Sequence, residues 1–165
     1  MIMNFIKNIA LSAFLTMGAF SMVLYTSCNP DECKDVVCAN GGACIGGNCD
    51  CATGYEGPRC ETASATKYIG TWNVSEPSCG GTYTNIISAG TTPTTIIFSN
   101  LGNFTSPAQV IASADENTLL ISDFTDATGR KFTGSGTFSS NSISVTYTVT
   151  YTDNTSETCT ATFSK

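Results

Sequence analysis

The sequence predicts two folded parts: a small disulfide-rich module, followed by an all-β antiparallel domain of about eight strands that forms a barrel or a meander. Six cysteines lie within residues 33–60, a segment too short to bury a core, so it must be stabilised by disulfides. From residue 68 onward, polar and apolar residues alternate in short runs between turn residues, which is typical of antiparallel strands. Stable disulfides form outside the cytosol, so the sequence also predicts export.

Residues 1–27 predict a signal peptide. Lys7 is the one charged residue before a stretch, residues 9–26, that is uncharged and mostly apolar or small. Two further interpretations of this stretch stay open. Cleavage after Ala19-Phe20-Ser21 would release a secreted protein, and an uncleaved span over residues 9–26 would act as a membrane anchor.

Cys28 is the odd member of a set of nine cysteines, and an unpaired cysteine in an exported chain needs an explanation. Leu24-Tyr25-Thr26-Ser27-Cys28 resembles a bacterial lipobox. The resemblance implies cleavage before Cys28, acylation of its new N-terminus with chains such as palmitate, and a lipidated tether over residues 28–32. Asp31 and Glu32 resemble the surface-export signal of lipoproteins in the Bacteroidetes phylum. We therefore expect attachment to the bacterial outer membrane.

The six cysteines of the module follow the pattern C-x4-C-x5-C-x4-C-x-C-x8-C, which by itself leaves their pairing open. The run includes Cys38-Ala39-Asn40-Gly41-Gly42-Ala43-Cys44 and ends in Gly57-Pro58-Arg59-Cys60. It resembles an EGF-like module over residues 33–60. The resemblance implies a role in protein interaction outside the cell, and the disulfides Cys33–Cys44, Cys38–Cys49 and Cys51–Cys60.

Asn29-Pro30-Asp31-Glu32-Cys33 matches the first half of the calcium-binding EGF-like pattern. The resemblance implies Asn29 and Glu32 as side-chain ligands, because calcium prefers carboxylate, amide and carbonyl oxygens. The second half of the pattern needs an Asp or Asn and an aromatic residue between the third and fourth cysteines. Ile45-Gly46-Gly47-Asn48 is too short and lacks the aromatic residue. We expect no cofactor, with calcium at Asn29 and Glu32 as the alternative.

Residues 61–67 are small and polar and predict a linker to the β domain, residues 68–165. The clearest strand is 142–152, where Ile143, Val145 and Tyr147 alternate with serine and threonine, as on a strand with one buried face. The same alternation, interrupted by turn residues, predicts strands near 68–74, 82–88, 94–99, 108–113, 118–124, 131–138, 142–152 and 157–163.

Gly70-Thr71-Trp72 lies in the first of these strands and resembles the G-x-W opening of lipocalin-like barrels, in particular the short lipocalin-like domains of Bacteroidetes lipoproteins. The resemblance implies that Trp72 packs in the core of a barrel, with contact to a ligand as the alternative. Larger lipocalins place a late basic residue over this tryptophan. Arg130 and Lys131 come too early for that role and Lys165 is terminal, so we expect the feature to be absent.

Cys79 follows the first predicted strand and Cys159 lies in the last. The first and last strands of an up-and-down barrel are neighbours. The sequence therefore predicts a Cys79–Cys159 disulfide that fastens the closure of the barrel.

Composition excludes several functions. A net charge of -6 with no histidine argues against nucleic-acid binding and against Ser-His-Asp or Cys-His catalysis. The acids Asp115, Glu116, Asp123 and Asp126 fall in predicted turns and fit solvated loops better than a glycosidase pair. We expect a non-enzymatic lipoprotein with an extracellular protein or glycan partner. The alternatives are a carrier of a small apolar ligand in the barrel, a purely structural envelope protein, and a calcium-binding module.

Overall fold

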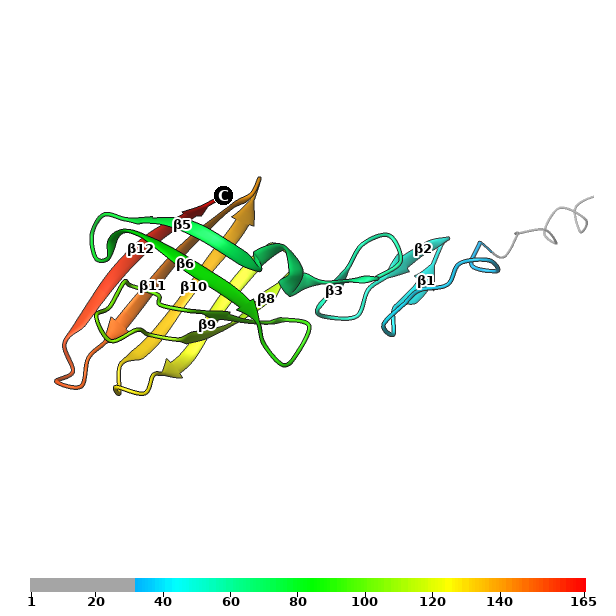
Figure 1. Ribbon diagram of the computed structural model, residues 1–165. Helices are drawn as coiled ribbons and strands as arrows, with labels where there is room; N and C mark the ends of the chain where they lie inside the picture. The colour runs from blue at the N-terminus through cyan, green and yellow to red at the C-terminus, as the bar shows by residue number, and fades with distance from the viewer. Residues whose placement is uncertain (1–31) are drawn as a thin grey trace, which may run out of the picture.

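The computed structural model describes residues 32–165 and contains the two predicted parts. A disulfide-rich module and a closed barrel of eight antiparallel strands lie end to end, so the molecule is elongated and the module forms a narrow stalk (Figure 1). Cys28 and Asn29 lie outside the described residues. The predictions that concern them stay predictions.

The module consists of two small hairpins, β1 (Ala43–Ile45) with β2 (Asn48–Asp50) and β3 (Tyr55–Glu56) with β4 (Thr62–Ala63). Its three disulfides are Cys33–Cys44, Cys38–Cys49 and Cys51–Cys60, the pairing that the sequence resemblance implied. Val37 and Ile45 are 76% and 64% exposed. The bridges, rather than an apolar core, therefore hold this part together.

The barrel has the simplest antiparallel connectivity. Each strand pairs with the next one along the chain, and the last strand pairs with the first, so the sheet is a closed barrel rather than an open meander. The eight predicted strands are all present, with ends shifted by a few residues: β5 (Gly70–Glu76), β6 (Gly81–Ala89), β7 (Thr95–Phe98), β8 (Val110–Asp115), β9 (Thr118–Thr125), β10 (Lys131–Ser139), β11 (Ser142–Thr150) and β12 (Ser156–Ser164).

Alternating side chains from the strands fill the barrel interior. On β11, Ile143, Val145 and Tyr147 are buried, as the alternation predicted. The largest fully buried side chains are Trp72, Tyr68, Tyr147, Phe98, Phe132 and Phe163. Glycine is required between them on β10, because a Cβ on Gly134 would lie 2.5 Å from the backbone oxygen of Thr146. Small and large residues thus share one tightly coiled wall.

The predicted closure bridge is present. Cys79 follows β5, Cys159 lies on β12, and a disulfide joins them. The two strands pair beside it, through Thr162 with Ser75 and Phe163 with Val74. The bridge therefore reinforces the junction between the first and last strands.

Candidate functional site

Trp72 lies at the end of the barrel nearest the module and is covered on every side. It is 1% exposed, its indole Nε1–H donates to the backbone oxygen of Tyr68 at 2.7 Å, and Phe138 packs edge-on against it. This packing agrees with a core role.

One expectation about Trp72 was wrong: a late basic residue does lie over the ring. Lys165 places its Nζ 4.2 Å from the centre of the indole ring and donates to the backbone oxygen of Ile69 at 3.1 Å. The terminal position of Lys165 misled the sequence reasoning. Because β12 ends beside β5, Lys165 reaches Ile69, the residue that directly precedes β5.

A loop, residues 99–109, joins β7 to β8 and lies at the end of the barrel away from the module, where Asn103 and Gly102 contact Gly80 and Tyr83. The Asn100 side chain holds this loop: Oδ1 accepts from the backbone N–H groups of Phe104 at 3.2 Å and Ala108 at 3.0 Å, and Nδ2 donates to the oxygen of Phe104 at 3.0 Å. The Phe104 ring packs edge-on against Phe132 and Tyr151. Phe104 therefore plugs this end.

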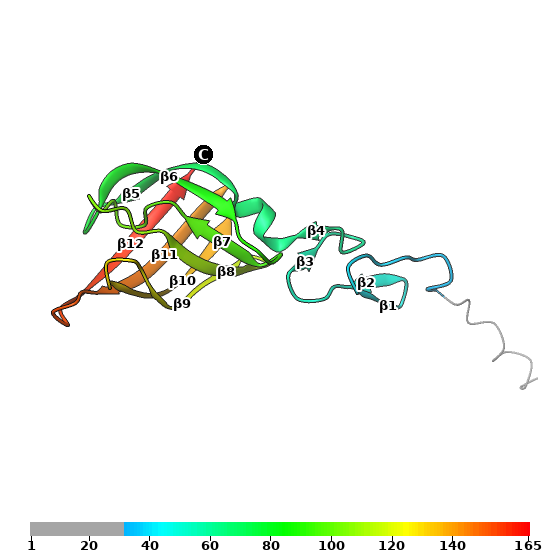
Figure 2. The same cartoon turned by 60° about the horizontal axis from the view of Figure 1, so that its bottom comes forward.

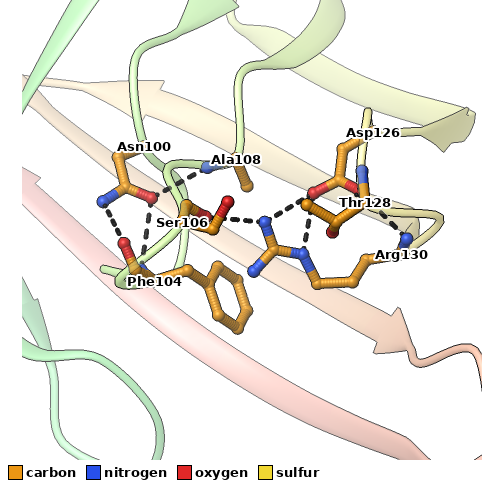
Figure 3. Close-up of polar contacts among 7 residues, drawn as sticks. All are labelled: Asn100, Phe104, Ser106, Ala108, Asp126, Thr128 and Arg130. Atoms are coloured by element: carbon orange, nitrogen blue, oxygen red, sulfur yellow. Dashed lines mark hydrogen bonds and ion pairs between the residues drawn. The ribbon is translucent and has the colours of Figure 1, made fainter.

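Arg130 fastens the same loop to the turn between β9 and β10. Its guanidinium pairs with Asp126 at 2.6 Å, donates to the oxygen of Ser106 at 2.8 Å and lies 4.0 Å from the centre of the Phe104 ring (Figure 3). Burial alone would raise the pKa of Asp126, but hydrogen bonds from Thr128 and Arg130 outweigh it and hold the pKa below its usual range. The carboxylate is thus ionised and fully occupied with structural contacts.

A second polar cluster lies at this end and was missed by the sequence reasoning. Glu76 is 0% exposed; its carboxylate accepts from the hydroxyls of Tyr147 at 2.5 Å and Tyr83 at 3.1 Å, and the Tyr83 oxygen accepts from Gly102 N–H at 3.1 Å. Burial raises the pKa of Glu76, and the hydrogen bonds from Tyr147 and Tyr83 oppose that shift. Strand parity could have found Glu76, because it lies four residues after Trp72 on β5 and therefore faces the same side.

A partly apolar hollow lies outside the barrel, and we call it the β8–β9 cleft. It has a volume of about 360 Å³ and is lined by Ile97, Pro107, Gln109, Ile111, Phe124, Asp126 and Ala127. β8 and β9 pair only from Ser113 with Leu120 to Asp115 with Thr118. The described residues form no further β8–β9 pairs, and Figure 2 shows the two strands on the side of the barrel that it brings forward.

A bulge explains why β8 and β9 separate. The register of β9 against β10 shifts between Phe132 and Gly134, and Asp123 has a φ of +42°. Such an extra residue bends its strand and strengthens the local twist. Ile111 and Leu120 remain 45% and 53% exposed beside the opening. The cleft therefore offers apolar side chains to solvent.

The predicted linker, residues 61–67, is folded. It contains β4 and most of a short 3-10 helix, η1 (Ser64–Tyr68), in which Ser64 is buried. The carboxylate of Asp115 accepts from Gly54 N–H at 3.0 Å and from the Ser64 hydroxyl at 3.5 Å. Lys67 pairs with Glu56 of the module at 2.6 Å. These contacts join the stalk to the barrel.

The four acids expected in solvated loops thus divide into two groups. Glu116 is exposed in a turn, as expected, whereas Asp123 is exposed but lies on β9 rather than in a turn. Asp115 binds the module and Asp126 binds Arg130. Of the calcium candidates, Glu32 is exposed, and its partner Asn29 lies outside the described residues. The calcium site at Asn29 and Glu32 stays a prediction.

Comparison with known proteins adds no relative to this description. No family model, curated protein or solved structure matches the chain. Within residues 32–165, no helix is long and apolar enough to cross a membrane.

Proposed function

We propose that the protein is an exported, lipid-anchored binding protein without catalytic activity. Cys28 attaches it to the bacterial outer membrane, the EGF-like module is a rigid stalk, and the barrel presents its outer surface to an extracellular protein or glycan. One observation carries the choice of the outer surface: buried side chains fill the interior of the barrel. A barrel of this kind contacts a partner through its outer surface.

The number of cysteines supports a lipid anchor at Cys28. The four disulfides use eight of the nine cysteines. Cys28 is the ninth, and none of the others is left to pair with it in the same chain. The acidic chain, with a net charge of -6, would be repelled by anionic headgroups, so acyl chains have to supply the membrane attachment.

The β8–β9 cleft is the surface we assign to the partner. An apolar hollow beside exposed isoleucine and leucine is the kind of surface that proteins use for contact. A filled interior speaks against a carrier that holds its ligand within the barrel. The cleft volume of about 360 Å³ lies at the lower end of small-molecule sites. A small apolar ligand in the cleft is therefore the second candidate.

The anchor is tested by fatty-acid labelling in a bacterial host that processes lipoproteins. We expect incorporation of labelled palmitate into the wild type and none into Cys28→Ser, which cannot be acylated at that position. Ser27→Ala is the matched control and should label normally. Labelling that persisted in Cys28→Ser would refute the lipid anchor.

The partner surface is tested with a photo-crosslinking amino acid placed at Ile111 in the cleft or at Ile86 outside it. Both side chains are exposed, at 45% and 55%, so they differ in place rather than in accessibility. We expect a specific adduct from position 111 alone. Equal adducts from both positions, or none, would refute the assignment.

Native mass spectrometry of residues 29–165 distinguishes the two candidates, because a bound small molecule would add mass that Ile111→Asp removes.

A further inference from the structure

Three potential metal ligands meet at the end of the barrel away from the module. Glu76, Cys79 and Cys159 each offer one ligand atom, and these atoms lie within 4.8 Å of one another. Glu76 and Cys79 delimit one tight turn, since Cys79 N–H donates to the oxygen of Glu76 at 3.2 Å. Cys159 comes from β12 on the other side of the closure. In the structure the two sulfurs are joined in a disulfide, so any metal site here belongs to the reduced protein.

The Glu76 carboxylate is already fixed in place for such a role. Tyr147 and Tyr83 each donate a hydrogen bond to it, and hydrogen bonds of this kind orient carboxylate ligands in metal sites. Gly80 permits the close packing, because a Cβ there would lie 2.5 Å from Oε2 of Glu76. The position of the carboxylate is therefore set by its surroundings.

The charge of Glu76 also lacks a protein counter-charge. Within residues 32–165 the two ion pairs are Lys67 with Glu56 and Arg130 with Asp126, and neither involves Glu76. A buried carboxylate without a cation is costly. A bound cation would supply the missing charge.

The donor set indicates the class of metal. Two ligands three residues apart on a turn, joined by a third from another segment, follow the spacing of zinc sites. Thiolates select soft or borderline cations, and a carboxylate completes tetrahedral zinc sites that keep one open position. The combination fits Zn²⁺ and its heavier analogue Cd²⁺ better than Ca²⁺ or Mg²⁺.

We propose that Cys79, Cys159 and Glu76 form a redox-gated site for a divalent cation of the Zn²⁺ class. A dithiol reductant transfers two electrons and two protons to the Cys79–Cys159 bond, leaving two thiols here and a disulfide in the reductant. The cation then displaces the two thiol protons and binds both sulfurs and the Glu76 carboxylate, with water as its fourth ligand. The closure of the barrel is thus held by a disulfide in one state and by a metal in the other.

The geometry requires only a local change. Tetrahedral bonds of about 2.3 Å place two sulfur ligands roughly 3.8 Å apart, so the thiolates must separate after reduction. The Cα atoms of Cys79 and Cys159 are already 5.8 Å apart. Cys79 lies on a turn and is half-buried, so its side chain can rotate while β12 stays in place, and the cation can enter from that side.

The test uses Cd²⁺ as the probe and residues 29–165 as the protein. The chain is reduced anaerobically with a phosphine reagent and titrated with Cd²⁺, native mass spectrometry counts the ions bound per chain, and the emission of Trp72 reports whether the barrel is folded. Trp72 is the single tryptophan and is buried in the barrel. The thiols of the module are present in every variant, so the Cd²⁺ ions that they bind contribute equally to each count, and the difference between variants reports the barrel site.

We expect the reduced wild type to bind one more Cd²⁺ than Cys79→Ala/Cys159→Ala. Glu76→Gln keeps both cysteines and should bind that ion at least about tenfold more weakly. If reduction loosens the barrel, Cd²⁺ should restore the native Trp72 emission in the wild type and not in the double variant. Equal ion counts, or an affinity unchanged in Glu76→Gln, would overturn the proposal.

Discussion

The disulfide that closes the barrel should contribute a large share of its stability, and replacing it by Cys79→Ala/Cys159→Ala measures that share. The two cysteines are 80 residues apart in sequence. In the chain-entropy model, a loop of this length restricts the unfolded chain by about 15 cal/mol/K, or about 4.5 kcal/mol at 25 °C. The Cys33–Cys44 bridge spans 11 residues, for which the same relation gives about 2.8 kcal/mol.

The loss of about 4.5 kcal/mol expected for the barrel bridge is large compared with the roughly 5–15 kcal/mol by which an ordinary domain is stable. For a domain of this size it corresponds to a fall in Tm of roughly 20–35 °C. The assay is urea unfolding of the oxidised protein, followed by the emission of Trp72, which is buried in the barrel. The free energy of unfolding of the double variant is compared with that of the wild type.

The control is Cys33→Ala/Cys44→Ala, which removes a bridge of the module and leaves the barrel bridge intact. It should move the Trp72 transition by less than about 1 kcal/mol, because the unfolded barrel segment is equally restricted in both proteins. A loss below about 1.5 kcal/mol in the barrel variant would refute the reasoning. It would mean that the unfolded chain is restricted by something other than this bridge.

Three further perturbations test other contacts. Lys165→Met removes the cation over Trp72 and should lower stability by about 0.5–1 kcal/mol and shift the Trp72 emission, whereas Lys131→Met at an exposed site should do neither. Glu76→Gln should remove a pH dependence: the raised pKa of Glu76 gives stability that is complete below the unfolded value of 4.5 and is lost as pH rises through the folded value. The wild type should therefore lose stability relative to the variant as pH rises above 4.5, and a free energy of unfolding that changes equally with pH in both proteins would contradict this. Asp115→Ala removes the acceptor for Gly54 and Ser64, so nitrogen-15 relaxation should show module and barrel tumbling separately; uniform relaxation would show that other contacts fix the stalk.

The barrel interior shows which features local pattern can predict. The alternation around Val145 and Tyr147 fixes which side chains point inward, because successive residues of a strand face opposite sides. Turn residues fix where strands end. Glu76 lies on the same face of β5 as Trp72, but the predicted strand ended near residue 74, so the burial of Glu76 was not predicted.

The contacts of Lys165 and Asp115 show what local pattern leaves open. Lys165 covers Trp72 only because the barrel closes and brings the end of β12 beside β5. Asp115 binds Gly54 across 61 residues of sequence. Residues 61–67 have the composition of a linker, and their fold follows from the two surfaces between which they lie.

The sequence by itself determined the disulfide-rich module, the strand count and the side chains that face the core, because cysteine spacing and the two-residue period of a strand are local properties. Tertiary structure alone decided that the barrel closes, that Glu76 meets Cys79 and Cys159, and that a bulge at Asp123 opens the β8–β9 cleft. The physical reason is that these features depend on strand register and on contacts between residues far apart in the chain.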